Sequence, residues 1–193
     1  ALAPELARFL GEGPAPLVLT PGSGHQQARR WVARAAQAAR RTGRRAIVLT
    51  PHRAQVPEPL PPGLLWQPYV PLRALLPHAA ALVHHGGIGT TAEALRAGVP
   101  QVIVPLAYDQ FDNAARVEAL GVGARVRGGR AGAPPRALAA ALRRLLDDPA
   151  TADACARTAG LAAADDRLDL GAQVEGLLGL APDAGFATFA DGI

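Results

Sequence analysis

The chain has 193 residues, of which 49% are hydrophobic, and a formal net charge of +4. This length suits one well-buried domain and is too short for two large ones. All twenty basic residues are arginine and only 4% of the residues are aromatic. Such a diffuse charge with few stacking platforms argues against nucleic acid as a partner.

The single cysteine, Cys155, excludes an internal disulfide and a thiolate metal cluster. No run of about twenty apolar residues occurs, and the start of the chain lacks a signal-peptide pattern. We therefore expect a cytoplasmic domain without a membrane span, which leaves peripheral membrane contact open. The sequence contains no methionine, and we interpret the chain as a piece processed or excised from a longer protein.

Short apolar runs alternate with helical patterns along the chain. Continuous apolar runs are typical of strands that are buried on both faces of a parallel sheet. Strands are predicted at Pro16 to Thr20, Ala46 to Thr50, Leu64 to Tyr69, Ala80 to His84, Gln101 to Pro105 and Val122 to Val126. Helices are predicted around Ala28 to Ala39 and at Pro71 to Leu76, Thr90 to Ala97, Asp109 to Leu120, Pro134 to Leu146, Thr151 to Ala164 and Ala172 to Leu178.

This alternation predicts an α/β fold, with a doubly wound, Rossmann-like parallel sheet of about six strands and helices on both faces. The domain is expected to span residues 16–180. Residues 1–15 lack a clear period and are predicted to be a linker-like segment, and residues 181–193 a tail. The segment Pro51 to Gly63 is predicted to be an irregular loop because it holds five prolines.

A glycine-rich turn follows the first predicted strand. Its two glycines would let the backbone approach a ligand closely, and Ser23 could donate to a phosphate oxygen at the start of the next helix. Ser23 and Gln26 also have the S-x-x-Q spacing of a capping box. The two interpretations are compatible, and the sequence does not decide between them.

Two adjacent histidines end the fourth predicted strand. Neighbouring strand residues point to opposite faces, so His84 and His85 are poorly placed to bind one metal ion. We expect His84 to pack inside the fold and His85 to face the crevice, where it would hydrogen-bond an anion.

The glycine-rich run from Gly86 to Gly89 lies where a strand ends and a helix starts. Backbone N–H groups at such a helix start can hold a phosphate group, although the run matches neither standard phosphate-loop pattern. Thr90 and Glu93 have capping-box spacing. Alternatively, Glu93 accepts hydrogen bonds from ribose hydroxyls, as acidic groups in doubly wound folds do.

Two further pairs have both structural and functional interpretations. Asp109 could cap the helix that follows, or Asp109 and Gln110 together could clamp sugar hydroxyls at the carboxyl edge of the sheet. Trp66 and Tyr69 lie at the end of the third strand. An aromatic ring there could stack on a nucleobase or simply belong to the core.

Together these motifs resemble the donor-binding signature of GT-B glycosyltransferases of the UDP-glycosyltransferase type. The matching residues are Trp66-Gln67-Pro68, His85 to Thr91, Glu93, Gly98-Val99-Pro100, Asp109-Gln110 and Asn113. The run from His84 to Gln101 is similar to bacterial members that glycosylate lipids, sterols or natural products, including rhamnosyltransferase-like and sterol-glucosyltransferase-like enzymes. The resemblance implies one half of a GT-B fold, the C-terminal half that binds the nucleotide sugar.

The resemblance also implies roles for individual residues. The base and ribose would contact Trp66, Gln67, Tyr69 and Glu93. The diphosphate would contact Ser23, His85, Gly87, Gly89, Thr90 and Thr91, and the donor sugar Asp109 and Gln110. Tyr69 stands where plant-type members have glutamine, and Gly89 where they have asparagine, so the recognition of the base is expected to differ from theirs.

The activity implied is inverting transfer of a hexose from a UDP- or dTDP-sugar to a lipid or natural-product hydroxyl, with neither metal nor cofactor. The general base would come from an N-terminal acceptor domain, so this chain alone would not transfer sugar. That acceptor domain would belong to the same protein or, in a split enzyme, to a partner chain. Another alternative is a non-catalytic binding module, whose best surface would be the arginines at 40, 41, 44 and 45.

Overall fold

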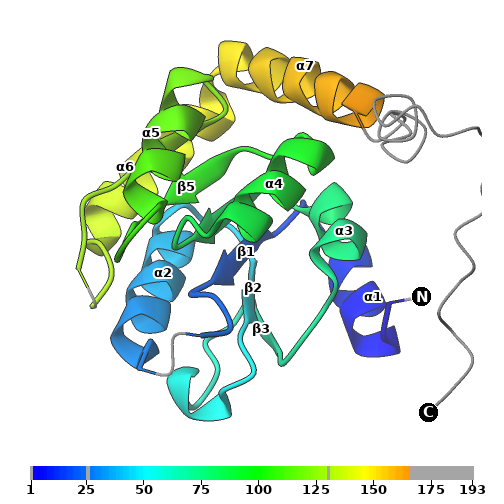
Figure 1. Cartoon of the computed structure of the whole chain (residues 1–193). Helices are drawn as coiled ribbons and strands as arrows, with labels where there is room; N and C mark the ends of the chain where they lie inside the picture. Colours follow the sequence, from blue (N-terminus) through cyan, green and yellow to red (C-terminus); the bar gives the residue numbers. More distant parts are fainter. Residues whose placement is uncertain (1, 25–26, 130, 166–193) are drawn as a thin grey trace, which may run out of the picture.

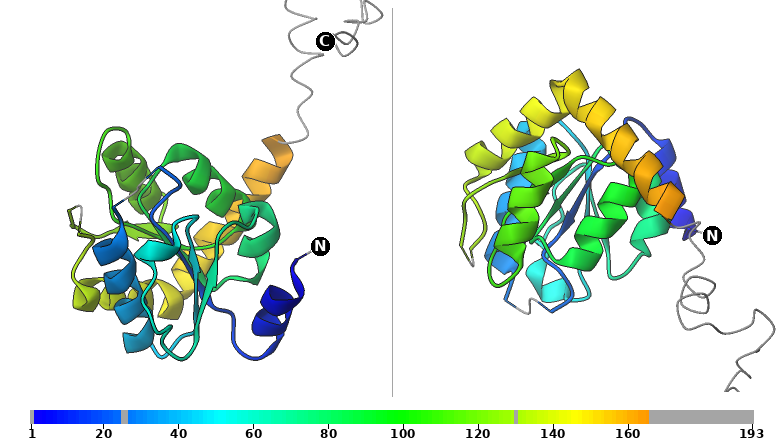
Figure 2. Two further views of the ribbon diagram at one scale, coloured as in Figure 1. Left: turned by 90° about the horizontal axis from the view of Figure 1, so that it is seen from below. Right: turned by 45° about the horizontal axis from the view of Figure 1, so that its top comes forward.

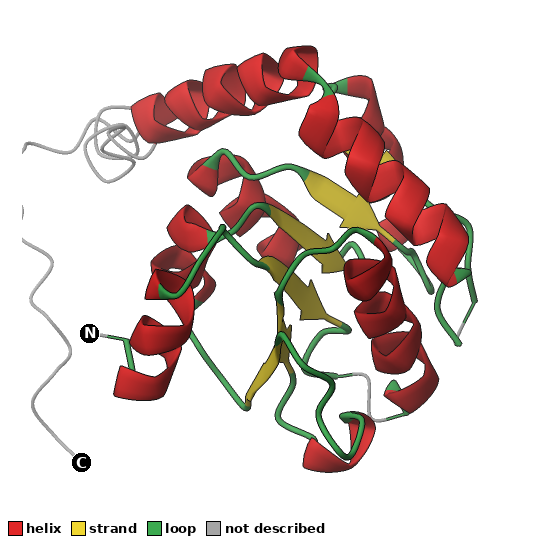
Figure 3. Ribbon diagram, turned by 180° about the vertical axis from the view of Figure 1, so that it is seen from behind, coloured by secondary structure: helices red, strands yellow, loops and turns green. Residues whose placement is uncertain are grey.

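The computed structural model describes residues 2–24, 27–129 and 131–165. Its centre is a six-stranded parallel sheet with the strand order β3-β2-β1-β4-β5-β6, and helices cover both faces (Figures 1 and 3). The strands are β1 (Leu17–Thr20), β2 (Ala46–Leu49), β3 (Leu64–Gln67), β4 (Ala81–His84), β5 (Gln101–Ile103) and β6 (Gly123–Arg125). The predicted fold class is therefore confirmed.

Seven α-helices lie within the described residues: α1 (Pro4–Gly11), α2 (Arg29–Arg41), α3 (Leu72–Leu75), α4 (Ile88–Ala97), α5 (Gln110–Ala119), α6 (Pro135–Asp147) and α7 (Pro149–Asp165). Two 3-10 turns, η1 (Arg53–Gln55) and η2 (Leu76–His78), complete the elements. The helix predicted at Ala172 to Leu178 and the tail at 181–193 lie outside the described residues.

Each strand sends alternate side chains to opposite faces, which explains why the strands are apolar throughout. Leu17 and Leu19 of β1 pack with Trp31 of α2 and Leu138 of α6. Val18, between them, packs on the other face against the cluster that holds residues of α1, α3 and α4. The sheet is thus buried between two helical layers.

Helix α7 lies outside these two layers and packs against α4 and α6 (Figure 2). Its buried Ala154 and Cys155 join Ile103 of β5 and Val117 of α5 in a third apolar cluster. Helix α4 ends at Gly98, which has a φ of +65° and lies close to α7, because a Cβ built there would be 3.3 Å from the Cβ of Ala159.

The first fifteen residues differ from the linker-like segment that the sequence predicts, because residues 4–11 form helix α1. Its Leu6 is buried in the same cluster as α3 (Figure 1). Arg45, just before β2, donates hydrogen bonds to the carbonyls of Phe9 and Pro14 and lies 4.6 Å from the Phe9 ring centroid. Residues distant in the sequence therefore hold α1 in place. The helix is so short that its own sequence pattern does not predict it.

The strand order reverses between β1 and β4. The chain leaves β1 toward β2 on one side and returns through β4 on the other. These two strands pair in parallel with Thr20 opposite His84, so their carboxyl ends lie side by side. In a doubly wound sheet this switch point is where ligands bind.

Candidate functional site

A cavity of about 560 Å³ opens at the carboxyl ends of β1, β2 and β3, beside the start of α4. It is lined by Thr20, Gly22, Ser23, Leu49, Thr50, Pro51, Pro68, Tyr69, Val70, Pro71, Leu72, Arg73, Gly89, Thr90 and Glu93. The lining of this one cavity therefore brings together five residues predicted for the site: Ser23, Tyr69, Gly89, Thr90 and Glu93. Its volume falls within the range of small-molecule sites.

The imidazole of His85 lies between Gly22, which lines this cavity, and Gly87. His85, Gly87 and Thr91, which were also predicted for the site, are not among the lining residues. A Cβ built on Gly22 would be 2.6 Å from His85 Cε1, and one built on Gly87 would be 2.6 Å from His85 Nε2. Gly22 also has a φ of +89°, a conformation that glycine adopts without strain. These two glycines allow the ring to sit directly against the turns that follow β1 and β4.

His84 points the other way and is fully buried. Its Nδ1 accepts a hydrogen bond from the Gly86 N–H at 3.1 Å, so its proton is on Nε2, which donates to Gln101 Oε1 at 3.0 Å. Burial, and secondarily the neighbouring His85, lowers the pKa of His84 to about 3. His84 is therefore a neutral structural residue that orients the turn after β4.

The start of helix α4 presents backbone N–H groups toward the cavity. The helix begins at Ile88, and the first three N–H groups of a helix have no partner within it. Gly89 and Thr90, which both line the cavity, lie in this turn. An anion is stabilised at such a position by these N–H groups and by the helix dipole.

The capping box predicted for Thr90 and Glu93 does not form. Gly87, not Thr90, occupies the N-cap, with no side-chain cap. Both the N–H and the hydroxyl of Thr91 donate to the Gly87 carbonyl at 3.0 Å, and Thr91 is buried. The helix starts three residues earlier than that spacing implies, and Thr91 stabilises its first turn.

The capping box predicted for Ser23 is also wrong. Helix α2 starts only at Arg29, with Ala28 as its N-cap and no side-chain cap. Ser23 lies in an exposed turn at the mouth of the cavity. Ser23 thus lines the cavity, but it lies six residues before the first residue of α2, Arg29.

The two aromatic residues of the predicted base site have different surroundings. Trp66 donates its indole N–H to the Thr50 carbonyl at 2.9 Å, and the Arg53 guanidinium lies 5.4 Å from its ring centroid. Tyr69 lines the cavity and is 76% exposed. Trp66 therefore has a structural role, whereas the ring of Tyr69 is accessible to a ligand.

Gln67 is buried at the end of β3, and its backbone carbonyl accepts the Thr50 N–H at 3.2 Å. Like Trp66, it does not line the cavity. Both residues hold β3 against the loop after β2 and so support the wall from behind. This supporting position follows from their contacts with Thr50, which the sequence motif alone does not reveal.

Glu93 stands at one end of the cavity, one helical turn beyond Gly89. Its carboxylate lies 3.5 Å from the Arg96 guanidinium, and its side chain is 29% exposed. Arg73 lines the same cavity and also shares with Glu93 a smaller neighbouring one of about 210 Å³. Arg73 is not predicted from the sequence, since an isolated arginine after a proline-rich turn belongs to no motif.

Asp109 and Gln110 follow β5 at the same edge of the sheet but do not line the cavity. The Gln110 Oε1 accepts the N–H groups of Leu106 and Ala107 at 2.8 and 3.1 Å, which leaves its Nε2 as the group to meet a ligand. Asp109 is exposed at the N-cap of α5, yet its side chain makes no capping bond. Its Oδ2 accepts instead from Asn113 at 3.0 Å.

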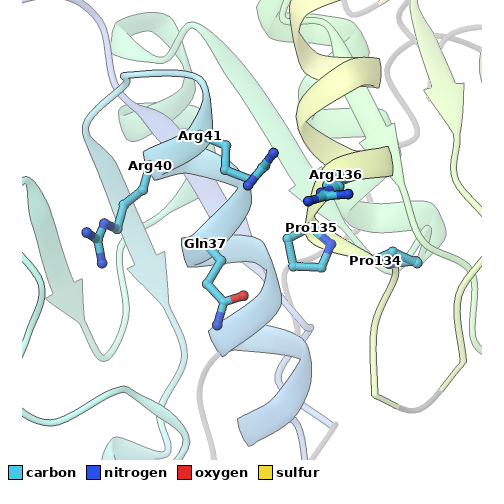
Figure 4. A pocket seen from close by; sticks show the side chains of 6 residues that line it. All are labelled: Gln37, Arg40, Arg41, Pro134, Pro135 and Arg136. Carbon is cyan, nitrogen blue, oxygen red and sulfur yellow. The ribbon is translucent and has the colours of Figure 1, made fainter.

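A second cavity, of about 610 Å³, lies between α2 and the start of α6 (Figure 4). Its lining includes Arg40, Arg41 and Arg136 with Gln37, Pro134 and Pro135. Arg41 points across the gap toward α6, whereas Arg40 points to the other side of α2 (Figure 4). Among the described residues, its lining contains no carboxylate or imidazole for acid–base chemistry. The predicted arginine surface is also smaller than expected, because Arg45 binds α1.

Over the part of the chain that the structure describes, no three histidine, cysteine or acidic side chains converge as metal ligands would. The same part of the chain contains no helix of the length and apolarity needed to cross a membrane.

Comparison with known proteins identifies the family. Residues 42–167 match the family model described as erythromycin biosynthesis protein CIII-like, C-terminal domain. Over 174 residues the chain is 43% identical to the O-mycaminosyltylonolide 6-deoxyallosyltransferase of Streptomyces fradiae, covering 86% of this chain and 38% of that protein. The chain is also 49% identical over 73 residues to the sterol 3-beta-glucosyltransferase of Neosartorya fischeri. This match covers 38% of this chain and 5% of that protein.

Solved structures agree with this assignment. The glycosyltransferase VinC, whose crystal structure is a complex with DTDP, superposes with a TM-score of 0.70 at 31% identity, covering 92% of this chain and 44% of VinC. The spinosyn rhamnosyltransferase SpnG gives a TM-score of 0.71 at 26% identity, with coverage of 82% and 44%. The chain thus corresponds to less than half the length of these proteins.

Proposed function

Because the chain belongs to the erythromycin biosynthesis protein CIII-like C-terminal domain family, we propose that it binds a nucleoside diphosphate sugar as the donor half of a glycosyltransferase. One observation carries the proposal: the His85 ring, held by Gly22 and Gly87, lies beside the N–H groups at the start of α4. This arrangement offers an imidazole N–H and oriented backbone N–H donors to the same anion. The position of His85 at the switch point between β1 and β4 supports this, because doubly wound folds bind their ligands there.

In this proposal the diphosphate lies between the turn of Gly22 and Ser23 and the first turn of α4. His85 and the N–H groups of Gly89 and Thr90 stabilise the negative charge that grows on the leaving diphosphate. No metal or cofactor is required for this step. Thr91 acts indirectly, because its N–H and hydroxyl already bind the Gly87 carbonyl.

The nucleoside occupies the cavity between Tyr69 and Glu93. Tyr69 offers an exposed ring to the base, while Glu93 accepts hydrogen bonds from the ribose, as acidic groups do in related folds. Trp66 and Gln67 support this wall. The base is thymine or uracil, a choice to which the DTDP complex of VinC lends weight.

The sugar extends toward Asp109 and Gln110. The carboxylate accepts from sugar hydroxyls and Gln110 Nε2 donates to them. An acceptor hydroxyl oxygen attacks the anomeric carbon in line, the bond to the diphosphate oxygen breaks, and the configuration inverts. The hydroxyl proton passes to a general base in the remainder of the full-length protein. The acceptor is a natural product or a lipid, in keeping with the macrolide and sterol relatives.

Calorimetric titration with UDP, dTDP and their glucose conjugates tests the proposal. We expect the folded domain to bind at least one nucleotide, more weakly than a full-length enzyme would, since one wall of the cleft belongs to the rest of the protein. His85→Ala and Glu93→Ala should each weaken binding by about tenfold, the value of one charge-assisted hydrogen bond. A folded wild-type domain that binds neither nucleotide would refute the proposal.

A further inference from the structure

Asn113 connects the two parts of the candidate site. It lies one turn into α5 and is only 8% exposed. Its Nδ2 donates to the Gly86 carbonyl at 2.9 Å and to Asp109 Oδ2 at 3.0 Å. An amide nitrogen has two hydrogens, so both donors of this group are used. One bonds to Gly86 in the turn after β4, and the other bonds to Asp109 at the start of α5.

The partners of Asn113 are themselves fixed. The Gly86 N–H donates to the buried His84, and a Cβ on Gly86 would lie 2.7 Å from Ile103 Cγ2 and 3.1 Å from the Gln110 carbonyl oxygen. The first turn of α5 therefore rests directly on the turn after β4. Asp109, by contrast, is exposed and would sample several side-chain rotamers without a partner.

We propose that Asn113 is a positioning residue, which sets where the Asp109 carboxylate stands relative to the diphosphate turn and so determines the affinity for the sugar portion of the donor. The inference rests on the proposed function of the site. Asn113 does not touch the donor and acts through Asp109. Its bond to Oδ2 leaves Oδ1 directed to the sugar, at a distance from the diphosphate that the Gly86 contact fixes.

Asn113→Asp keeps nearly the same side-chain shape and removes both hydrogen bonds, because a carboxylate cannot donate to Gly86 or Asp109. The new carboxylate also repels that of Asp109, which moves Asp109 away from its position in the same way as loss of the bond does. The quantity to measure is the dissociation constant for dTDP divided by that for dTDP-glucose, and likewise for UDP and UDP-glucose. This ratio cancels any loss of diphosphate affinity shared by both ligands. We expect it to fall by about tenfold in Asn113→Asp.

Asp112→Asn is the matched control. Asp112 precedes Asn113, is exposed and pairs with Arg116 at 2.7 Å, so its loss should leave the ratio unchanged. In an Asp109→Ala background, Asn113→Asp should have no further effect on the ratio, because its action passes through that carboxylate. If Asn113→Asp does not fold, Asn113→Ser, which keeps one donor, replaces it in both comparisons.

The outcomes separate this inference from the proposed function. A wild-type domain that binds no nucleotide refutes both. Failure of the wild type to bind either sugar nucleotide would also refute both. Nucleotide-sugar binding with an unchanged ratio in the Asn113 variant, or a further fall of the ratio in the Asp109→Ala background, would overturn the role of Asn113 alone.

Discussion

The His85 ring fills the space that a side chain on Gly22 would need, with only 2.6 Å between its Cε1 and the Cβ position of that glycine. These two residues are distant in the sequence and meet because β1 and β4 are neighbours in the sheet. Any side chain at Gly22 must therefore displace the ring that we assign to the diphosphate.

Gly22→Ala should damage both folding and binding. The φ of +89° disfavours a side chain, and the clash with His85 adds to that strain, so we expect the free energy of unfolding to fall by about 2 kcal/mol. Nucleotide affinity should fall by about tenfold as the ring moves. Urea denaturation and calorimetric titration measure the two effects.

Gly24→Ala is the control for this substitution, because no atom of the described residues lies within 4 Å of a Cβ built at that position. We expect its stability and its affinity to stay near those of the wild type. Equal losses in the two alanine variants would show that the contact with His85 is not what makes Gly22 necessary.

Tyr69→Ala and Trp66→Phe should have opposite consequences. Tyr69 is 76% exposed, so its loss should lower nucleotide affinity by about fivefold to tenfold, the value of one stacking contact, with little change in stability. Trp66→Phe removes the bond to Thr50 and should lower the free energy of unfolding by about 1 kcal/mol. Titration and denaturation of both variants check this, and a larger affinity loss in Trp66→Phe would reverse the assignment.

The sequence predicts most of the fold because the strands are apolar on both faces, as in the runs Leu17–Thr20 and Ala81–His84. It also predicts that His84 is internal, since neighbours on a strand face opposite ways. It does not predict where helices begin. Thr90 and Ser23 match capping-box spacings, but a local pattern does not show that Gly87 is the N-cap of α4 or that α2 begins only at Arg29.

Contacts across the sheet are the part of the site that sequence reasoning misses. The bonds from Asn113 to Gly86 and from Trp66 to Thr50 join segments that are 27 and 16 residues apart. Their partners depend on which strands are neighbours and on which face each residue lies. For the same reason the helix at residues 4–11 was missed, because Arg45 holds it from a distant turn.

His84→Asn should flatten the dependence of stability on pH. The buried imidazole has a pKa of about 3 instead of 6.5. Between these two values, His84 is protonated in the unfolded chain and neutral in the folded chain. Stability is then highest above pH 6.5 and falls by up to about 1.4 kcal/mol per pH unit toward pH 3. Asn keeps an acceptor for Gly86 and does not titrate.

Denaturation of the wild type and of His84→Asn between about pH 7.5 and about pH 4.5 measures this contribution. The variant should be less stable at neutral pH, since it leaves a small cavity, and its stability should decline less steeply in acid. Parallel curves for the two proteins would contradict the pKa assigned to His84.

Arg45→Met should release helix α1. The substitution keeps the apolar stem but loses the hydrogen bonds to Phe9 and Pro14 and the contact with the Phe9 ring. We expect faster amide hydrogen exchange in residues 4–11 and a loss of about 1–2 kcal/mol in stability. Arg44→Met is the control, and equal exchange rates in the two variants would argue against this anchoring.

The hydrogen-bond chain from Gln101 through His84 and Gly86 to Asn113 and Asp109 is made entirely of protein groups. The turn after β4 is therefore preorganised, and its conformational entropy is already lost when the protein folds. A donor that enters needs to immobilise few protein torsions in this half of the site. Differences in donor affinity among variants of this turn should then appear mainly as differences in dissociation rate.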